Sequence, residues 1–470
     1  ITTNIMSKLK NSLFLKLLVI FLLIVVLLVP TFLVNTLIDE RMDLKNEAIA
    51  ELGSKWGAEQ TITGPYISIP YTAQVNKEVY INNKKTIETN YVTNWIKVLP
   101  ETLDIDAEVK TQIKKRGIYD VPLYTSDVYL KGNFNINLDL LDVPKNVIHF
   151  GKAKLLFGIS DLKGIKNDMK LILDSVPLEF LSEMNFRDIS SEKSFRKFNY
   201  SSSSRSYNSR SQVGHGGITA SIPFSLKENM SYDFQTHVKL NGNSGLFFNP
   251  LGSTTTTELR SNWVNPKFDG HRLTDTNHVT DQGFYAKWVV NHLNRPFPKL
   301  WLNQDSKIEN AEYGVSFLTG VDNYQKTYRV AKYAILFIVI TYLVFFFIET
   351  LNTIHLHPIQ YLLVGFAILI FYLLVLSISE HLGFNFSYLL ATIGTLALVT
   401  LYSFAIFKNK RMSYILFGIL LIMYGYFYFI IQLEDYALLF GSLFIFIVLA
   451  SVMYISRKID WFNVKGNETN

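Results

Sequence analysis

Long apolar segments are the feature that most constrains the fold of this 470-residue chain. A membrane-spanning helix needs about 20 mostly apolar residues, and six segments meet that requirement. One lies near the start of the chain and five follow one another near its end. The segments are 13–34, 333–351, 359–378, 386–407, 412–432 and 437–456. The sequence therefore predicts a polytopic α-helical membrane protein with six transmembrane helices.

The first apolar segment, 13–34, has two possible interpretations because lysines flank its start. A signal peptide would have an apolar run of roughly 7–15 residues followed by a small-x-small cleavage site. This run is longer, and no such site follows it. We therefore expect an uncleaved transmembrane helix that continues into water as a helical stalk over 35–57, preceded by a cytoplasmic segment over 1–12.

Basic residues predict the orientation of the spans, because short cytoplasmic loops are enriched in Lys and Arg. The breaks on the side of the two termini are basic, whereas the other two short breaks carry acids. We expect both termini to be cytoplasmic, with a five-helix bundle over 331–456, a cytoplasmic tail over 457–470 and a domain outside the cytoplasm over about 38–330. The basic residues are Lys8, Lys10, Lys16, Lys408, Lys410, Arg411, Arg457, Lys458 and Lys465.

The polar region over 35–330 has the pattern of a β-rich domain. After Gly64 and Pro65 it is rich in β-branched and aromatic residues and is broken by Gly, Pro, Asn and Asp. We expect about ten to fourteen strands in two packed antiparallel sheets that form a sandwich. The Ser-rich run 198–217 has almost no apolar residues, so a flexible loop is expected there.

Composition and missing motifs bear on the class of function. The chain has no cysteine, which excludes thiolate zinc sites, disulfides and cysteine nucleophiles. Its net charge of +6 lies largely beside apolar segments and does not indicate nucleic-acid binding. The sequence has no G-x-S-x-G, H-E-x-x-H, Walker A or G-x-G-x-x-G pattern. We therefore expect a protein that is not an enzyme, with no cofactor or metal and no nucleic-acid partner.

An acid and two histidines surround the break between the second and third spans, in the stretch ETLNTIHLHPIQ. His357 precedes Pro358, and proline suits the first position of a helix, so a short cytoplasmic turn over 352–357 is predicted. Glu349 with His355 and His357 could hold a metal, but a His-x-His pair alone is a weak signal.

For Glu349 we favour a structural role at the inner interface. An acid at a helix C-terminus is disfavoured by the helix dipole and needs a cation. Lys408, Lys410 or Arg411 on the same side are the expected partners. A proton-linked or ligand-linked role stays open, because an acid near membrane depth is a functional candidate.

Glu380 and His381 lie at the other end of the third span, about 33 Å away at 1.5 Å per residue. Gly383 fits a helix C-cap, and His381 suits the dipole of the helix end. Arg329 and Lys332 lie on the same outer side. We expect them to pair with Glu380 and so clamp the second span to the third.

A basic stretch is the candidate surface of the β-rich domain. Lys115, Arg116 and Tyr119 surround Gly117, and lysine and arginine side chains can bind an anion. The favoured interpretation is a solvated strand end followed by a turn at Gly117.

Longer stretches resemble the CreD family of bacterial inner-membrane proteins. They are SKWGAEQTITGPYISIPY (54–71), LPETLDIDAEVKTQIKKRGIYDVPLY (99–124), SNWVNPKFDG (261–270), GFYAKWVVNHLNR (283–295) and the long segment 328–384. The resemblance covers nearly the whole chain except the Ser-rich run. It implies a protein of the inner (cytoplasmic) membrane with a periplasmic domain. It also implies a link to envelope integrity, envelope stress, colicin tolerance and β-lactam response, with no reaction and no catalytic residues.

Two functions from different classes follow from these observations. The first is a non-catalytic envelope protein whose β-rich domain binds an envelope component, or a periplasmic or membrane partner protein. The alternative is a transporter or lipid-handling protein that uses polar positions near Glu349 and Glu380, and a membrane hydrolase is least favoured. In each case the lipid bilayer is the expected partner of the spans.

Overall fold

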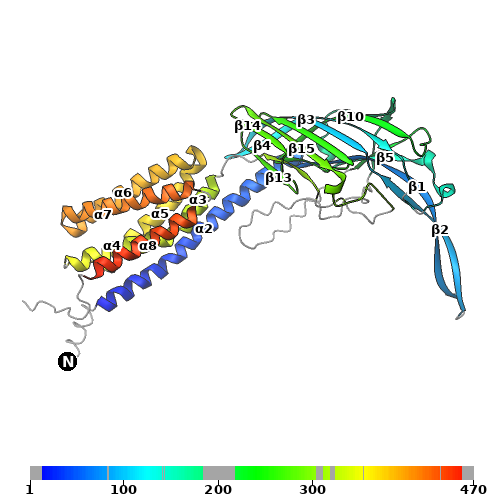
Figure 1. The fold of residues 1–470 in the computed structure, drawn as a ribbon. Coiled ribbons are helices and arrows are strands. Elements are labelled where there is room, and N and C mark those ends of the chain that lie inside the picture. The colour runs from blue at the N-terminus through cyan, green and yellow to red at the C-terminus, as the bar shows by residue number, and fades with distance from the viewer. Residues whose placement is uncertain are drawn as a thin grey trace, which may run out of the picture. The chain divides into compact units, whose positions relative to one another are not determined.

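The chain folds into two compact units, Ile1–Leu44 with Val321–Asn470 and Lys45–Gly320. We call them the helical unit and the β-rich unit (Figure 1). The computed structural model describes residues 13–81, 84–139, 141, 143–183, 217–302, 308, 311–317, 323–352, 354–433 and 436–457. Residues 198–216 of the predicted Ser-rich loop lie outside these ranges, and Gly217 is the first residue of a strand.

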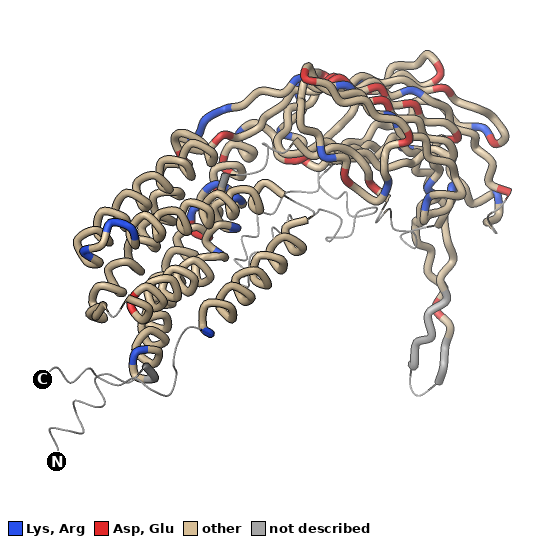
Figure 2. The backbone as a smooth tube through the Cα atoms, turned by 60° about the vertical axis from the view of Figure 1, so that its left-hand side comes forward, with Lys and Arg blue, Asp and Glu red and all other residues tan. Residues whose placement is uncertain are grey.

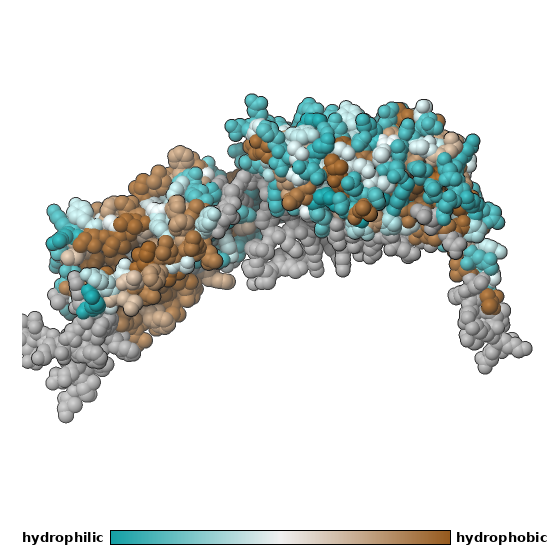
Figure 3. Space-filling view, viewed as in Figure 1, coloured by the Kyte–Doolittle hydropathy of each residue, from teal (hydrophilic) through white to brown (hydrophobic). Residues whose placement is uncertain are grey.

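Within the described residues, six helices are long and apolar enough to cross a membrane, which confirms the predicted number of spans. Figure 3 shows hydrophobic residues over much of the surface of the helical unit and mostly hydrophilic residues over the β-rich unit. A surface of this kind is expected where helices face lipid. The helices are α2 (Leu13–Trp56), α4 (Ala334–Leu351), α5 (Pro358–Leu382), α6 (Phe384–Phe407), α7 (Lys410–Gln432) and α8 (Ala437–Ser456).

Helix α2 has 44 residues and belongs to both units. At 1.5 Å per residue it is about 66 Å long, roughly twice the length of a membrane span. It ends before Gly57, whose φ of 146° is accessible to glycine and strained for other residues. A side chain at this position would also overlap the backbone carbonyl of Asn241.

A short helix that the sequence did not predict precedes the second span. It is α3 (Asn323–Lys332), and Tyr333 separates it from α4. Arg329 and Lys332 therefore lie in the last turn of α3, where basic side chains suit the negative end of the helix dipole. They therefore precede the second span, which was expected to begin at 333.

Aromatic rings fill much of the interior between α4, α5 and α7. The ring of Phe337 on α4 lies 4.3 Å from that of Phe427 and 4.9 Å from that of Tyr424, measured between centroids. Phe371 on α5 lies 4.9 Å from Tyr424. Offset and edge-on contacts of this kind add to the dispersion energy of packing, which drives helix association where water is absent.

The β-rich unit contains two sheets. In the first, the order is β13-β17-β11-β1-β5-β9-β8, with β2 beside β1 and β16 beside β2. Its strands are β1 (Gln60–Ile81), β2 (Lys84–Val98), β5 (Lys154–Ile159), β8 (Leu181–Glu183), β9 (Gly217–Ser221), β11 (Gly245–Phe248), β13 (Pro266–Gly270), β16 (Leu300–Leu302) and β17 (Tyr313–Phe317).

The second sheet has eight strands in the order β14-β15-β12-β3-β4-β10-β6-β7. The strands are β3 (Thr102–Arg116), β4 (Tyr119–Asn135), β6 (Lys170–Leu173), β7 (Val176–Glu179), β10 (Ser231–Asn243), β12 (Thr254–Ser261), β14 (Thr276–Thr280) and β15 (Gly283–Asn291). Four short 3-10 helices, Lys145–Val147, Phe150–Lys152, Leu162–Gly164 and His292–Asn294, complete the described elements.

Both sheets are mixed, so the prediction of antiparallel sheets is wrong. β1 pairs with β11 in parallel, and β3 pairs with β12 in parallel. Parallel partners cannot be joined by a hairpin, so they are distant in sequence and leave no local signal. The described residues form 17 strands, more than expected, because strands of three to five residues such as β16 and β6 are too short to show alternation.

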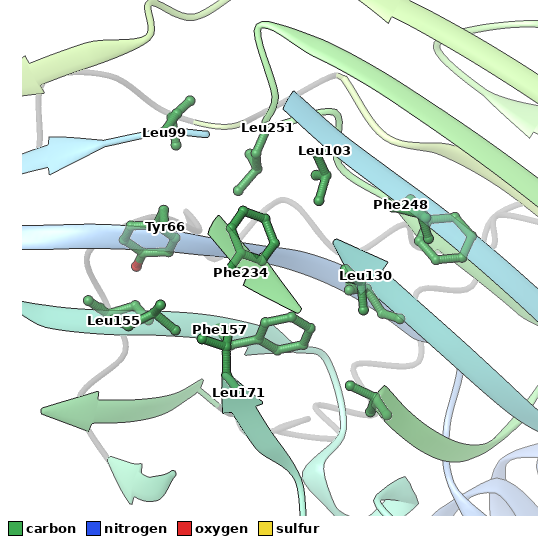
Figure 4. Close-up of a cluster of buried hydrophobic side chains, with 14 of the residues drawn as sticks. Tyr66, Leu99, Leu103, Leu130, Leu155, Phe157, Leu171, Phe234, Phe248 and Leu251 are labelled. Atoms are coloured by element: carbon green, nitrogen blue, oxygen red, sulfur yellow. The ribbon is translucent and has the colours of Figure 1, made fainter. Parts of the chain in front are cut away.

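Alternation along the longer strands separates a buried face from an exposed one. On β3, Leu103 and Ile105 are buried, whereas Asp104 and Asp106 between and beyond them are exposed. Apolar residues from both sheets form one cluster (Figure 4). Tyr66, Leu155 and Phe157 come from the first sheet, and Leu103, Leu130 and Phe234 come from the second.

Two buried hydrogen bonds join the sheets across this cluster. The hydroxyls of Thr257 on β12 and Tyr313 on β17 are 2.7 Å apart, and the Tyr124 hydroxyl on β4 donates to the carbonyl of Gly245 on β11 at 2.8 Å. Burial raises the pKa of the Tyr313 hydroxyl above its ordinary value, so it stays a neutral partner. Because an unpaired buried hydroxyl is costly, these bonds favour one arrangement of the two sheets.

Candidate functional site

The strongest polar cluster of the helical unit surrounds Glu349, in the last turn of α4. Its carboxylate is 3% exposed, and one oxygen lies 2.9 Å from the ammonium of Lys16 on α2. The Tyr361 hydroxyl donates to the other oxygen at 2.8 Å, and the backbone N–H of Leu356 donates to the first at 3.2 Å. An ion pair with these additional hydrogen bonds offsets the cost of burying a carboxylate.

The cation that meets Glu349 differs from the predicted one. We expected Lys408, Lys410 or Arg411, and the structure places Lys16 there instead. The two residues are 333 positions apart, so sequence spacing could not reveal the pair. A signal was nevertheless present, because Lys16 is the one charged residue in the first apolar segment, and such a charge needs a partner.

One histidine of the turn, His357, has a local role. His357 is the N-cap of α5, and its side chain accepts a hydrogen bond from the backbone N–H of Ile359 at 3.3 Å. The side chain of Gln360 accepts from the N–H of His357 at 2.9 Å, which completes a capping box. Pro358 occupies the first turn, so the predicted turn between the helices is confirmed.

His355 and His357 are both exposed, and they do not join Glu349 in a ligand set. Over the described ranges, no three His, Cys, Asp or Glu side chains gather closely enough to hold a metal ion. The structure therefore separates the residues that the sequence placed together as a possible metal site.

A second polar cluster surrounds Glu380, near the C-terminus of α5. Its carboxylate lies 3.6 Å from the guanidinium of Arg41 on α2, and the Tyr324 hydroxyl on α3 donates to it at 3.2 Å. Arg41 takes the place of the predicted partners Arg329 and Lys332, because these lie at the far end of α3 from Tyr324.

The end of α5 has the predicted cap. Gly383 is its C-cap with a φ of 75°, and its N–H donates to the carbonyl of Ser379 at 3.2 Å. His381 lies in the last turn, where a basic side chain suits the helix dipole.

Both acids thus pair with cations of α2. Lys16 and Arg41 are about 38 Å apart along the helix at 1.5 Å per residue, close to the thickness of a bilayer with its interfacial regions. Residues 17–34 are apolar apart from one threonine, and the charged residues Asp39 and Glu40 lie directly before Arg41. The two ion pairs therefore lie at opposite ends of the span and fix the register of α2 along α4 and α5.

The basic stretch of the β-rich unit lies in the hairpin of β3 and β4. Gly117, with a φ of 60°, makes the turn. Arg116 donates two hydrogen bonds of 2.9 Å to Glu51 on α2, and the ammonium of Lys114 lies 4.6 Å from the ring centre of Trp56. This hairpin therefore holds the end of α2.

Lys115 and Tyr119, the other two candidate residues of that hairpin, differ in how exposed they are. Lys115 is exposed and Tyr119 is half-buried. With Arg116 committed to Glu51, the hairpin offers less positive charge to an external anion than its sequence indicates. Anion binding by Lys115 stays a prediction.

Removing Lys16 should destabilise the helical unit more than removing the whole ion pair. Lys16→Met leaves the buried carboxylate of Glu349 without its cation. We expect a cost of about 1–3 kcal/mol, less than for a fully buried pair because the Lys16 side chain is partly exposed. The double variant Lys16→Met with Glu349→Gln should recover part of this loss. Thermal unfolding of the purified protein in detergent measures both.

Arg41→Gln is the matched control for Lys16→Met, because it breaks the more exposed and longer of the two pairs. Its side chain is 39% exposed, so the expected loss is smaller, at most about 1 kcal/mol. Equal losses for Lys16→Met and the double variant would contradict a direct pair between Lys16 and Glu349.

Comparison with known proteins confirms the resemblance seen in the sequence. A family model described as "Inner membrane protein CreD" matches residues 12–462. The curated "Inner membrane protein CreD" of Escherichia coli (strain K12) is 30% identical over 464 residues. That alignment covers 97% of this chain and 95% of the relative.

Proposed function

Since the chain belongs to the CreD family of inner membrane proteins, we propose that it is a non-catalytic protein that supports cell-envelope integrity or the response to envelope stress. In this proposal the β-rich unit is a sandwich that faces the periplasm and binds an envelope component or a partner protein. The observation that carries the proposal is that the acids Glu349 and Glu380 of the helical unit are both matched by cations of the same chain.

The pairing of Glu349 and Glu380 with cations of α2 supports an anchoring role for the helices. A transport path needs polar groups that a substrate can reach. The Glu349 carboxylate instead has partners on α2 and α5 and in the turn between α4 and α5. The buried hydroxyls of Thr341 and Ser403 donate to carbonyls of their own helices.

The distribution of charge supports the orientation. Five basic residues lie at or next to helix ends: Lys16 near the start of α2, Lys408 after α6, Lys410 and Arg411 at the start of α7, and Arg457 after α8. Since successive spans alternate in direction, these ends are on the side of the N-terminus. Basic residues favour the cytoplasmic side. The β-rich unit would then be periplasmic, where its hydrophilic surface meets envelope components.

The alternative is a transporter or lipid-handling protein that uses Glu349. The observation in its favour is a carboxylate that is 3% exposed in a membrane unit, which is a functional candidate in general. The two functions differ in what they require of this side chain. Anchoring needs a stable pair, whereas transport needs a carboxylate whose charge or partner changes.

Complementation separates the two functions. In a strain that lacks the gene, the wild-type chain should restore survival under a β-lactam or detergent challenge. Glu349→Gln keeps the hydrogen-bonding shape and removes the charge, so it should restore survival in proportion to its level in the membrane. Loss of survival at normal protein level would favour the transport alternative. Failure of the wild-type chain to change survival would contradict the envelope function.

Single cysteines test the orientation without background, because the chain has no native cysteine. Lys163→Cys lies at an exposed position of the β-rich unit, and Lys410→Cys lies at the exposed first residue of α7. A maleimide that does not cross the inner membrane should label the first in intact spheroplasts and the second only after lysis. Labelling of Lys410→Cys alone in intact spheroplasts would reverse the proposed orientation.

A further inference from the structure

The outer face of the eight-stranded sheet carries a cavity that none of the contacts above uses. Its volume is about 680 Å³, and side chains from β3, β4, β6, β10 and β12 line it. Small-molecule sites have volumes of roughly 300–1,000 Å³, so this cavity is large enough for a ligand. Figure 2 shows acidic and basic residues together on strands of this unit.

The pairing of the strands places polar and aromatic side chains in two rows across this face. In the first row, Asp106 is opposite both Glu258 and Tyr129, and Tyr129 is opposite His237. Residues directly opposite one another share a face of the sheet. The second row contains Thr256, Asp104, Lys131, Gln235 and Ile172.

The rows form an extended surface. The second row crosses five neighbouring strands, and adjacent strands are about 4.8 Å apart, so it spans about 19 Å. An elongated ligand with repeated units fits this geometry better than a single compact molecule.

A stacked aromatic pair, Tyr129 with His237, forms one end of the first row. The rings of Tyr129 and His237 are stacked, with centroids 4.3 Å apart and planes 10° apart. The side chain of Asp127 lies 3.0 Å from the His237 ring nitrogen and holds this pair in place. Tyr129 is 54% exposed on the solvent face of the sheet, so it has no role in the core. Its ring offers a preorganised apolar surface beside the charged side chains of the cavity.

The carboxylates of this face are held by basic neighbours. Arg260 bonds Asp106 at 2.6 Å and Glu258 at 2.9 Å, and Lys287 donates to Glu258 at 3.0 Å. The hydrogen bond from Lys287 lowers the pKa of Glu258, so this carboxylate stays ionised at neutral pH. Fixed carboxylates are strong hydrogen-bond acceptors for hydroxyl groups.

The balance of charge selects the class of ligand. Asp104, Asp106 and Glu258 disfavour an anion in the cavity, and Lys131 and Lys170 disfavour a cation. An uncharged chain rich in hydroxyl and amide groups can donate to the carboxylates, accept from the lysines and pack its C–H faces against a ring.

We propose that this face, centred on Tyr129 and its stacked partner His237, is a binding site for a neutral oligosaccharide strand. The inference rests on the proposed function, since it names the envelope component that the β-rich unit would bind. Tyr129 and Ile172 supply apolar contact, and Asp104, Asp106 and Gln235 bind hydroxyl and amide groups.

Calorimetric titration of the full-length protein in detergent tests the site. The probe is a hexamer of β-1,4-linked N-acetylglucosamine, which is neutral and soluble. The wild-type chain should bind it, and Tyr129→Ala should weaken binding by about tenfold or more, the effect of losing one stacked ring. Tyr129→Phe keeps the ring and should bind as the wild type does.

Tyr91→Ala is the matched control, because Tyr91 is 72% exposed on β2 of the other sheet. It should leave binding unchanged. No heat from the wild-type chain at millimolar hexamer, or equal binding by Tyr129→Ala, would overturn the inference. Binding of an acidic or basic peptide in place of the hexamer at this face would also overturn it.

The titration and the complementation assay together separate this inference from the proposed function. If the hexamer does not bind while the wild-type chain restores survival in the complementation assay, the oligosaccharide site is wrong and the envelope function stands. If the hexamer binds through Tyr129 while deletion of the gene leaves survival unchanged, the site stands and the envelope function is wrong.

Discussion

The cost of placing charge in a membrane governs the helical unit. Glu349 and Glu380 come from α4 and α5, and each pairs with a cation of α2, although about three hundred residues of chain separate α2 from these helices. Leaving the buried Glu349 without its cation would be costly, and leaving the more exposed Glu380 without its cation would cost less. Both pairs therefore oppose sliding of α2, to different degrees. Between them, Gly365 lacks a side chain where a Cβ would overlap Leu27 and the Tyr342 hydroxyl. A small residue at this position lets the helices approach closely.

The same helix also carries the contacts of the β-rich unit. Past Arg41, α2 continues without interruption to Trp56. Glu51 is held there by two hydrogen bonds from Arg116, and the indole N–H of Trp56 donates to the carbonyl of Tyr124 at 3.1 Å. These contacts hold the last turns of α2 against the β3–β4 hairpin within the β-rich unit.

Features set by neighbouring residues could be predicted from the sequence. Apolar length predicted the six spans, and Pro358 and Gly383 predicted the start and end of α5. The β-branched and aromatic residues after Pro65 predicted a β-rich unit, because strand propensity acts residue by residue. The break at Tyr333 had no such signal, since the residues on both sides of it favour a helix.

Features set by distant residues could not be predicted. Several basic residues were expected on the same side of the membrane as Glu349. Which of them pairs with it depends on how the helices pack, and the packing brings Lys16 to the carboxylate. The parallel pairing of β3 with β12 likewise depends on the order of strands in the folded sheet. The cavity around Tyr129 exists because that pairing brings Glu258 beside Asp106, which is 152 positions earlier in the chain by their residue numbers.

Disulfide cross-linking in native membranes tests the register of α2 most directly, because the chain has no native cysteine. Leu27→Cys with Gly365→Cys joins the positions that face each other between the two ion pairs. This pair and its control are both made in a Tyr342→Phe background, which removes the hydroxyl that a Cβ at position 365 would overlap. Val26→Cys with Phe366→Cys moves each cysteine to an exposed neighbour as a control. The account predicts a rapid cross-link for the first pair and little for the second. A cross-link for the second pair alone, or none for the first under oxidant, would contradict the docking of α2 by its paired charges.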